Sequence, residues 1–355
     1  MENVKISGIQ LFLLIIGFLF GSTSILTPVA SAKNDAWLAV IIGGLGGACL
    51  VWMYVAIAVL NPSKTLVEIL RNRFGKYLGN AIAILYIWYI VHFSALTFRN
   101  FGEFIVTVTY PETPMVVIIG IFAALLVYAV NSGIEVVSRS SELFVPLLFV
   151  IIIIISLSLI TTHDFTAFLP LLENGIKPVL HAAFEFATFP LGEIFVFLMV
   201  FPHFNKKINN LKKIAAFSVI IFILLYLWSI FEYLFVLGKD LLYRANFVPH
   251  IIASLIPNSN LEPLIDIYLI IGGGVKISIC IYAAAKALSQ VFGISDYRKL
   301  VTAVTTFSVV LSVWVYENLL EMVEFAQKVW PYYSIPFQIV IPLILLLSSY
   351  RAKTD

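Results

Sequence analysis

Apolar stretches long enough to cross a lipid bilayer recur along this chain. The segment Ile151 to Ile155, for example, lies inside a longer apolar run. A helix needs about 20 such residues to span a hydrocarbon core of roughly 30 Å. The runs are continuous and do not alternate with polar residues, which predicts membrane-spanning helices and not a barrel. With 61% hydrophobic and 12% charged residues among 355, a water-soluble domain could not cover this much apolar surface.

The hydropathy pattern predicts an all-α integral membrane protein with a single transmembrane domain over residues 1–355. The ten expected spans lie at about 9–31, 37–60, 80–108, 113–130, 141–161, 180–202, 213–237, 264–292, 299–319 and 334–350. Only Lys5 precedes the first apolar segment and many spans follow it, so we do not expect a cleavable signal there.

Basic residues are distributed unequally between the two sides of this arrangement. Ten spans place both termini on one side. Of the 22 Lys and Arg residues, three fall within spans, five lie in loops on the far side, and the other 14 lie on the side of the termini. The three are Arg99, Lys276 and Lys286, and the five are Lys33, Lys177, Lys239, Arg244 and Lys328. Because cytoplasmic loops are rich in Lys and Arg, both termini are predicted to be cytoplasmic.

Ten spans divide into two sets of five, residues 1–161 and 162–355, which predicts an inverted repeat of the LeuT-like kind. Such transporters carry interrupted helices at matching positions of the two halves. The first span contains Gly21-Ser22-Thr23-Ser24 at its midpoint, and the sixth contains Phe189-Pro-Leu-Gly-Glu193. Proline removes a backbone donor and clashes with the preceding helical turn. We therefore expect spans 1 and 6 to be discontinuous.

An interrupted helix exposes backbone N–H groups at one half and C=O groups at the other. The positive end of a half-helix attracts a carboxylate, and free carbonyls attract an ammonium group or Na⁺. A zwitterionic amino acid offers both groups, so the paired breaks indicate a binding site. The alternative for Gly21 to Ser24 is a flexible kink whose hydroxyls bond back to their own helix.

Several charged side chains fall at bilayer depth, where each costs about 2.5–3.5 kcal/mol without compensation. Arg99 and Glu103 are four residues apart and can pair, which favours a structural or gating role over ligand contact. Lys276 has no carboxylate at helical spacing in its own span, so its partner is a ligand or another span. Glu193, at the sixth-span break, is the natural candidate, and snorkelling of the lysine is the alternative.

The sequence lacks the usual signatures of catalysis. The five histidines show no metal-ligand spacing, and the two cysteines lie in spans and imply no disulfide. The glycines of Gly43-Gly44-Leu45-Gly46-Gly47 lie in a span without a preceding strand, so we interpret them as helix-packing residues and not as a phosphate loop. We expect no enzyme activity, no metal, no cofactor and no nucleic-acid partner.

The chain resembles the GerAB-type family, the B subunits of nutrient germinant receptors of endospore-forming bacteria, classed with the amino acid–polyamine–organocation transporters. The resemblance runs over essentially the whole chain. It rests on Gly21 to Pro28, Asn34 to Trp37, Arg99 to Glu103 with Pro111 to Pro114, Phe189 to Glu193, and Lys276 to Phe292.

This resemblance implies a 5+5 transporter-like fold, location in the spore inner membrane, and assembly with an A subunit and a lipoprotein C subunit. It also implies a ligand pocket among spans 1, 3, 6 and 8. Carried onto this sequence, the pocket residues are Gly21, Ser22, Thr23, Ser24, Tyr89, Phe93, Thr188, Phe189, Leu191 and Lys276. Thr23 and Lys276 depart from the residues of many relatives, which alters pocket size and charge, so no relative's ligand can be transferred.

The expected function is that of a B subunit that binds a small germinant, an amino acid above all, and signals through partner subunits. The principal alternative is an H⁺- or Na⁺-coupled amino acid permease, with Glu193 as proton carrier or Lys276 in place of the cation. A third reading is a membrane scaffold whose site has lost its ligand.

Overall fold

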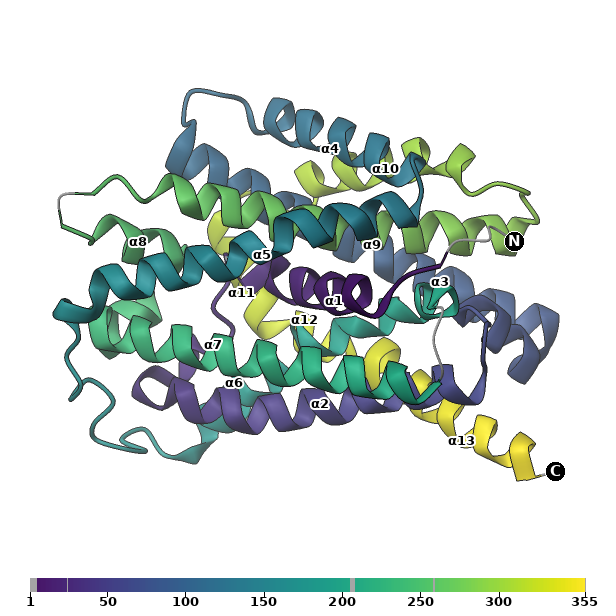
Figure 1. Cartoon of the computed structure of the whole chain (residues 1–355), viewed down its shortest axis with the longest axis horizontal. Coiled ribbons are helices and arrows are strands. Elements are labelled where there is room, and N and C mark those ends of the chain that lie inside the picture. The colour runs from purple at the N-terminus through teal and green to yellow at the C-terminus, as the bar shows by residue number, and fades with distance from the viewer. Residues whose placement is uncertain (1–4, 24, 205–207, 258, 355) are drawn as a thin grey trace.

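The chain folds into a bundle of long helices that run roughly along one axis (Figure 1). The structure is a computed structural model, and it describes residues 5–23, 25–204, 208–257 and 259–354. Both termini lie at the same end of the bundle (Figure 1). Within the described residues the only extended pairing is an isolated parallel bridge between Ile6 and Phe204.

Most of the helices follow one another with short connections, whereas residues 163–175 form a longer connection between η3 and α6. In chain order they are α1 (Gly8–Thr23), η1 (Ala30–Asp35), α2 (Ala36–Leu60), α3 (Leu66–Phe104), η2 (Ile105–Thr109), α4 (Met115–Asn131), α5 (Ile134–Leu159), η3 (Ile160–Thr162), α6 (Ile176–Thr188), η4 (Leu191–Met199), η5 (Phe201–His203), α7 (Ile208–Arg244), α8 (Val248–Ser254), α9 (Pro263–Phe292), α10 (Arg298–Trp314), α11 (Leu319–Lys328), α12 (Trp330–Tyr333), η6 (Pro336–Val340) and α13 (Ile341–Thr354).

The described residues contain seven helical segments long and apolar enough to cross a membrane, and an eighth if α10 and α11 form one span. These two helices meet at an angle of 104° across a short break. Two shorter apolar helices, Gly8–Gly21 within α1 and α4, lie among the long ones. The chain is therefore a multi-pass helical membrane protein.

The outward faces of the bundle are apolar. On α4, Ile121 and Leu125 are exposed, and on α5 Leu143 and Leu157 are exposed. Such continuous exposed apolar surface is unusual for a protein in water, whereas a bilayer would cover it. The composition of these faces thus agrees with the membrane assignment made from the sequence.

Helix α1 lies at the centre of the bundle and packs against α5, α7 and α9. Its contact with α9 is close because two glycines meet there. A Cβ atom placed on Gly21 would lie 2.5 Å from the carbonyl oxygen of Gly272 and 2.7 Å from Cβ of Lys276. Only a residue without a side chain permits this approach of the two backbones.

The glycines of α2 serve the same purpose toward α6 and η4. A Cβ on Gly43 would lie 2.4 Å from the carbonyl oxygen of Ala183, and one on Gly47 would lie 2.4 Å from Cδ1 of Leu191. The prediction that these glycines mediate helix packing is confirmed.

Both predicted interruptions coincide with helix ends. Helix α1 ends at Thr23, and the next helical turn, η1, begins at Ala30. Helix α6 ends at Thr188, a cis peptide bond joins Phe189 to Pro190, and the 3-10 helix η4 follows. The two breaks bring the ends of four helical segments into the interior of the bundle.

Two glycines with positive φ bend the long helices near their ends. In α3, Gly75 has φ of 77°, which separates the amphipathic turns after Leu66 from the long apolar part. The hydroxyl of Thr65 accepts from the backbone N–H of Glu68, whose carboxylate in turn accepts from the backbone N–H of Thr65. This capping box fixes the start of α3 at Leu66. In α7, Gly238 has φ of 72°.

Candidate ligand site at the helix breaks

An ion pair buried in the bundle joins α9 to the segment that follows the α6 break. Nζ of Lys276 lies 2.7 Å from Oε2 of Glu193, and neither side chain has any exposed surface. The sequence prediction that Glu193 is the partner of Lys276 is confirmed, and snorkelling of the lysine is excluded because its ammonium group is fully buried. Because both charges are buried, removal of either side chain would leave the other charge without a counter-ion.

Aromatic rings from α1, from α3 and from the break after α6 surround the ammonium group of Lys276. Nζ lies 5.2 Å from the ring centroid of Phe18, 4.8 Å from that of Phe93 and 4.9 Å from that of Phe189. Ring faces attract a cation within about 6 Å, and the attraction grows when water is excluded. The rings therefore stabilise the charge of Lys276 alongside Glu193.

Glu193 and two of these rings, Phe93 and Phe189, also line a small cavity of about 30 Å³. The remaining walls come from Leu26 in the first break, from α3, from α11 and from the residues on either side of α11. Those further lining residues are Leu96, Thr97, Asn100, Tyr316, Met322, Phe325, Ala326 and Trp330. The cavity thus lies between the two breaks and has roughly the room for a water or two.

One oxygen of the buried pair remains available. Oε1 of Glu193 has no hydrogen-bond partner among the described residues, whereas Oε2 accepts from Lys276. Buried polar atoms without a partner are rare and mark strain, a catalytic role or a missing ligand. Here Glu193 lines the cavity, so a ligand in the cavity that carries a hydrogen-bond donor could bond to Oε1.

Several residues expected in the pocket have other partners. Gly21 and Leu191 form the helix contacts described above. The hydroxyl of Thr23 donates to the carbonyl of Leu19 at 3.3 Å, and that of Thr188 lies 2.9 Å from the carbonyl oxygen of Phe184. Both hydroxyls therefore bond back to their own helices, as the kink interpretation expects. The side chain of Ser22 and all of Ser24 lie outside the part of the chain that the structure describes.

Tyr89 belongs to a neighbouring aromatic cluster and does not line the cavity. Its ring stacks on Phe337 with centroids 4.3 Å apart, and its hydroxyl accepts from Nε2 of Gln338 at 3.0 Å. Gln338 is fully buried in the irregular start of the last span. The hydroxyl of Tyr54 lies 3.0 Å from the carbonyl oxygen of Gly192 and 2.8 Å from that of Gln338, so it ties this cluster to the α6 break.

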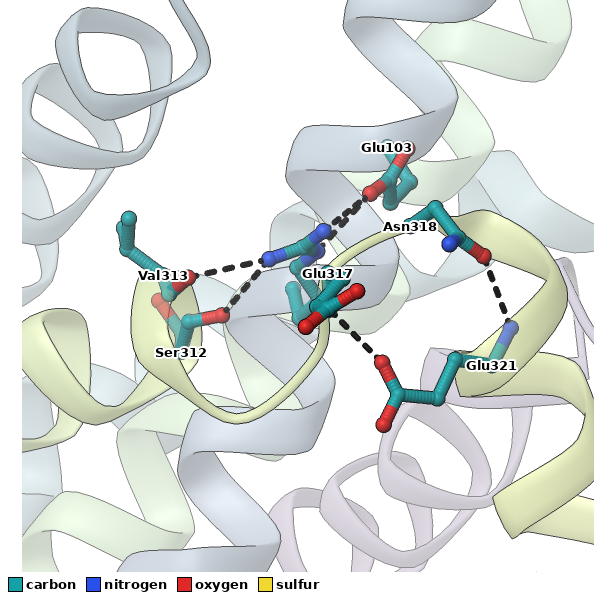
Figure 2. A network of polar contacts seen from close by, with 7 residues as sticks. Glu103, Ser312, Val313, Glu317, Asn318 and Glu321 are labelled. Atoms are coloured by element: carbon teal, nitrogen blue, oxygen red, sulfur yellow. Dashed lines mark hydrogen bonds and ion pairs between the residues drawn. The ribbon is translucent and has the colours of Figure 1, made fainter.

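Arg99 and Glu103 form a second buried ion pair, near the C-terminal end of α3. Nη2 of Arg99 lies 2.6 Å from Oε1 of Glu103. The guanidinium also donates to the carbonyls of Ser312 and Val313, at 3.4 and 3.2 Å (Figure 2). These are among the last carbonyls of α10, which have no partner within their own helix.

The Arg99 contact lies where α10 ends and α11 begins. The side chain of Asn318 caps α11 by accepting from the backbone N–H of Glu321 at 3.0 Å (Figure 2). Helix α11 supplies Met322 and Phe325 to the wall of the cavity. Neither Arg99 nor Glu103 lines the cavity, so their geometry is that of a structural clamp on its outer wall.

The sequence did not point to α11 as a wall of the site. The segment after Trp314 carries neither glycine nor proline before the new helix starts, so no strong stop signal precedes it. The signal that could have found it is the Asn318-x-x-Glu321 capping pattern.

Comparisons with known proteins agree with this architecture. The profile of the spore permease family, described as spore germination protein, matches residues 5–322. Spore germination protein KB of Bacillus subtilis (strain 168) is 31% identical over 99% of this chain and 96% of its own length. Spore germination protein GerQB of Bacillus cereus is 26% identical over 62% of this chain and 61% of its own length.

Among solved structures, a nucleobase-cation-symport-1 family transporter, in a closed conformation with bromovinylhydantoin bound, is similar in fold. The TM-score is 0.68 at 13% sequence identity, over 97% of this chain and 78% of the transporter. The expected transporter-like helical fold is confirmed by this likeness. The family match to germination proteins agrees with the expectation of no enzyme activity. This chain belongs to the spore germination protein family.

Proposed function

We propose that the chain is the B subunit of a nutrient-germinant receptor, and that it binds a small germinant, an amino acid above all, between the two helix breaks. The observation that carries this proposal is the fully buried Lys276–Glu193 pair, whose Glu193 lines a cavity flanked by both breaks. Intramembrane ionisable residues are usually functional, because their cost must be offset by a partner or a ligand.

A zwitterionic amino acid matches this pair in charge. Its ammonium group would donate to Oε1 of Glu193, which lacks a partner. Its carboxylate would accept from Lys276, and its side chain would lie among apolar residues such as Leu96 and Met322. Charge-assisted hydrogen bonds of this kind are about twice as strong as neutral ones, so the exchange of partners is favourable in a site without water.

The size of the cavity implies a change of shape on binding. A cavity of about 30 Å³ cannot hold an amino acid, so the walls must move apart. The ligand would then favour the arrangement with separated walls. Partner subunits in contact with this chain would respond to that change of shape. A shift from 1:99 to 99:1 requires about 5.5 kcal/mol of differential binding between the two arrangements.

The proposed membrane arrangement has ten spans in two inverted repeats, residues 1–161 and 162–355. It counts the short helices α1 and α4 as spans, joins α6 to η4 and α10 to α11, and treats α12 to α13 as the last. Support comes from the shared end of the two termini (Figure 1) and from the excess of basic residues on that side. The termini would face the spore core, across the spore inner membrane.

The proposed partners are an A subunit and a lipoprotein C subunit, which follow from the resemblance to germinant-receptor B subunits. The family match supports a role in germination over an H⁺- or Na⁺-coupled permease.

Spores that carry Lys276→Met together with Glu193→Leu would test the proposal. The double change removes both charges and leaves none buried alone. We expect a normal amount of receptor by immunoblot and loss of germination in the nutrients that this receptor serves. The matched control is Arg139→Met with Glu135→Leu, which removes an exposed ion pair of the same charges and should not affect germination. Normal nutrient germination of the Lys276/Glu193 double variant would contradict the proposed site.

A further inference from the structure

A larger cavity, of about 270 Å³, lies next to the small one. We call it the vestibule, and it is lined by the segment after α1, the C-terminal half of α6, the end of α7 and the face of α11. Leu26, Phe189 and Ala326 line both cavities, so these three residues separate them. The vestibule is large enough for a small organic molecule without movement of the walls.

A buried carboxylate lines this vestibule. The side chain of Glu185 is only 4% exposed, and its Oε1 has no hydrogen-bond partner among the described residues. Nδ1 of His181 lies 3.1 Å from that oxygen, but its ring is half-exposed and carries a charge only when protonated. A neutral imidazole leaves the carboxylate without a counter-ion in a region where charges are expensive.

The other vestibule residues add a pattern of charge and shape. Arg244, an exposed residue at the end of α7, lines the same cavity, and within the described part of the chain its guanidinium makes no ion pair or hydrogen bond. The same cavity is also lined by the apolar side chains of Ile25, Leu320 and Val323. A ligand with an ammonium group, an apolar body and a carboxylate would find a complement for each part.

We propose that the vestibule is a second ligand site, distinct from the Lys276–Glu193 cavity, which binds primary ammonium compounds and above all amino acid zwitterions, with Glu185 as the counter-ion of the ammonium group. Arg244 adds a partner for the carboxylate of a zwitterion. The site needs no opening of the inner cavity, so it fills first and delivers the ligand next to Phe189. This second site does not depend on the proposed germinant function, because the evidence for it is the lining of the vestibule.

Three probes that share a phenyl ring separate the charges. They are phenethylamine with an ammonium group, phenylalanine with both charges, and 3-phenylpropionate with a carboxylate alone. Binding to the full-length protein in nanodiscs is measured by isothermal titration calorimetry. We expect phenethylamine and phenylalanine to bind, and 3-phenylpropionate to bind at least tenfold more weakly.

Substitutions at Glu185 and Arg244 test whether these residues bind the probes. Glu185→Gln should weaken phenethylamine binding at least tenfold, whereas Glu185→Asp, which keeps the charge, should stay within a few fold of the unchanged protein. Arg244→Met should weaken phenylalanine and leave phenethylamine unchanged. Glu112→Gln removes an exposed carboxylate outside the vestibule and should have no effect. Thermal unfolding of each variant checks its folding.

Two results would overturn the vestibule site: absence of phenethylamine binding to the unchanged protein, or equal binding to Glu185→Gln. The double variant Lys276→Met/Glu193→Leu separates this inference from the proposed function, because it should bind phenethylamine as before. Loss of phenethylamine binding in that variant, with Glu185→Gln unaffected, would assign the ammonium site to the inner cavity.

Discussion

Nζ of Lys276 and Oε2 of Glu193 meet at 2.7 Å in the fully buried centre of the bundle. The lysine comes from the middle of α9, and the glutamate comes from the turn that follows the cis Phe189–Pro190 bond. The pair therefore joins a continuous helix to an interrupted one, at a cavity that the other interrupted segment also borders through Leu26. A contact of this kind fixes the segment after the α6 break to α9, and of its two residues only Glu193 lines the cavity.

Removal of one charge should harm the protein more than removal of both. Lys276→Met leaves Glu193 buried alone, and we expect a loss of about 3–5 kcal/mol in the free energy of unfolding. Lys276→Met with Glu193→Leu should recover most of that loss, because apolar residues of similar volume fill the space. Denaturant unfolding of the three variants, including Glu193→Leu, gives the double-mutant cycle. Additive effects of the two single changes would contradict a direct interaction.

The contact between Gly21 and Gly272 predicts a steric effect at the end of α1. Gly21→Ala places a methyl group 2.5 Å from a backbone carbonyl oxygen, so α1 and α9 must separate. Overpacking of this kind costs about 1–3 kcal/mol, which outweighs the gain in helix propensity. Gly120→Ala in α4 is the control, because its added Cβ meets nothing within 4 Å. It should be neutral or slightly stabilising, and equal effects of both changes on the unfolding midpoint would refute the packing argument.

The contact of Arg99 with the end of α10 predicts that it restrains α11. Arg99→Met removes donors from the carbonyls of Ser312 and Val313 and leaves Glu103 unpaired. The free energy of local opening of residues 315–328 should fall by about 1–3 kcal/mol. Hydrogen exchange read by mass spectrometry measures this opening. Arg139→Met, which breaks an exposed pair, should leave exchange in α11 unchanged. Unchanged protection of α11 in Arg99→Met would show that the clamp has no effect.

The hydroxyl of Tyr54 bonds to backbone carbonyls near the second break, so we expect its removal to destabilise the protein. Tyr54→Phe deprives the buried carbonyls of Gly192 and Gln338 of a donor, which should lower the free energy of unfolding by about 1–3 kcal/mol. Tyr128→Phe removes a hydroxyl from a side chain that is 74% exposed. This control should change the free energy of unfolding by less than about 0.5 kcal/mol. Thermal unfolding in the same detergent compares them, and a Tyr54→Phe protein as stable as Tyr128→Phe would speak against the bond.

The two helix breaks could be predicted because their causes are local. Pro190 lacks a backbone donor, and Gly21 with its hydroxyl neighbours weakens a helix, so both features can be identified from single segments. The partner of Lys276 could also be predicted, because an isolated charge at bilayer depth restricts the choice to the few opposite charges in other spans.

The walls of the cavity could not be predicted, since they depend on how helices cross. Tyr89 and Phe93 are four residues apart on one helix, yet only Phe93 lines the cavity, while Tyr89 packs on Phe337. Helix α11 reaches the site because the chain turns by 104° after α10. Periodicity shows which residues share a helix face, but it does not show which neighbour that face meets.

The most direct test of the central claim is a thermal-shift measurement on the purified full-length protein with a panel of free amino acids. At least one amino acid should raise the unfolding midpoint of the unchanged protein, by an amount that grows with concentration as binding to the folded state requires. The rise should be clearly smaller for Lys276→Met/Glu193→Leu, in which only the vestibule remains to bind the amino acid. An amino acid that stabilises the double variant as much as the unchanged protein would contradict binding at the Lys276–Glu193 pair.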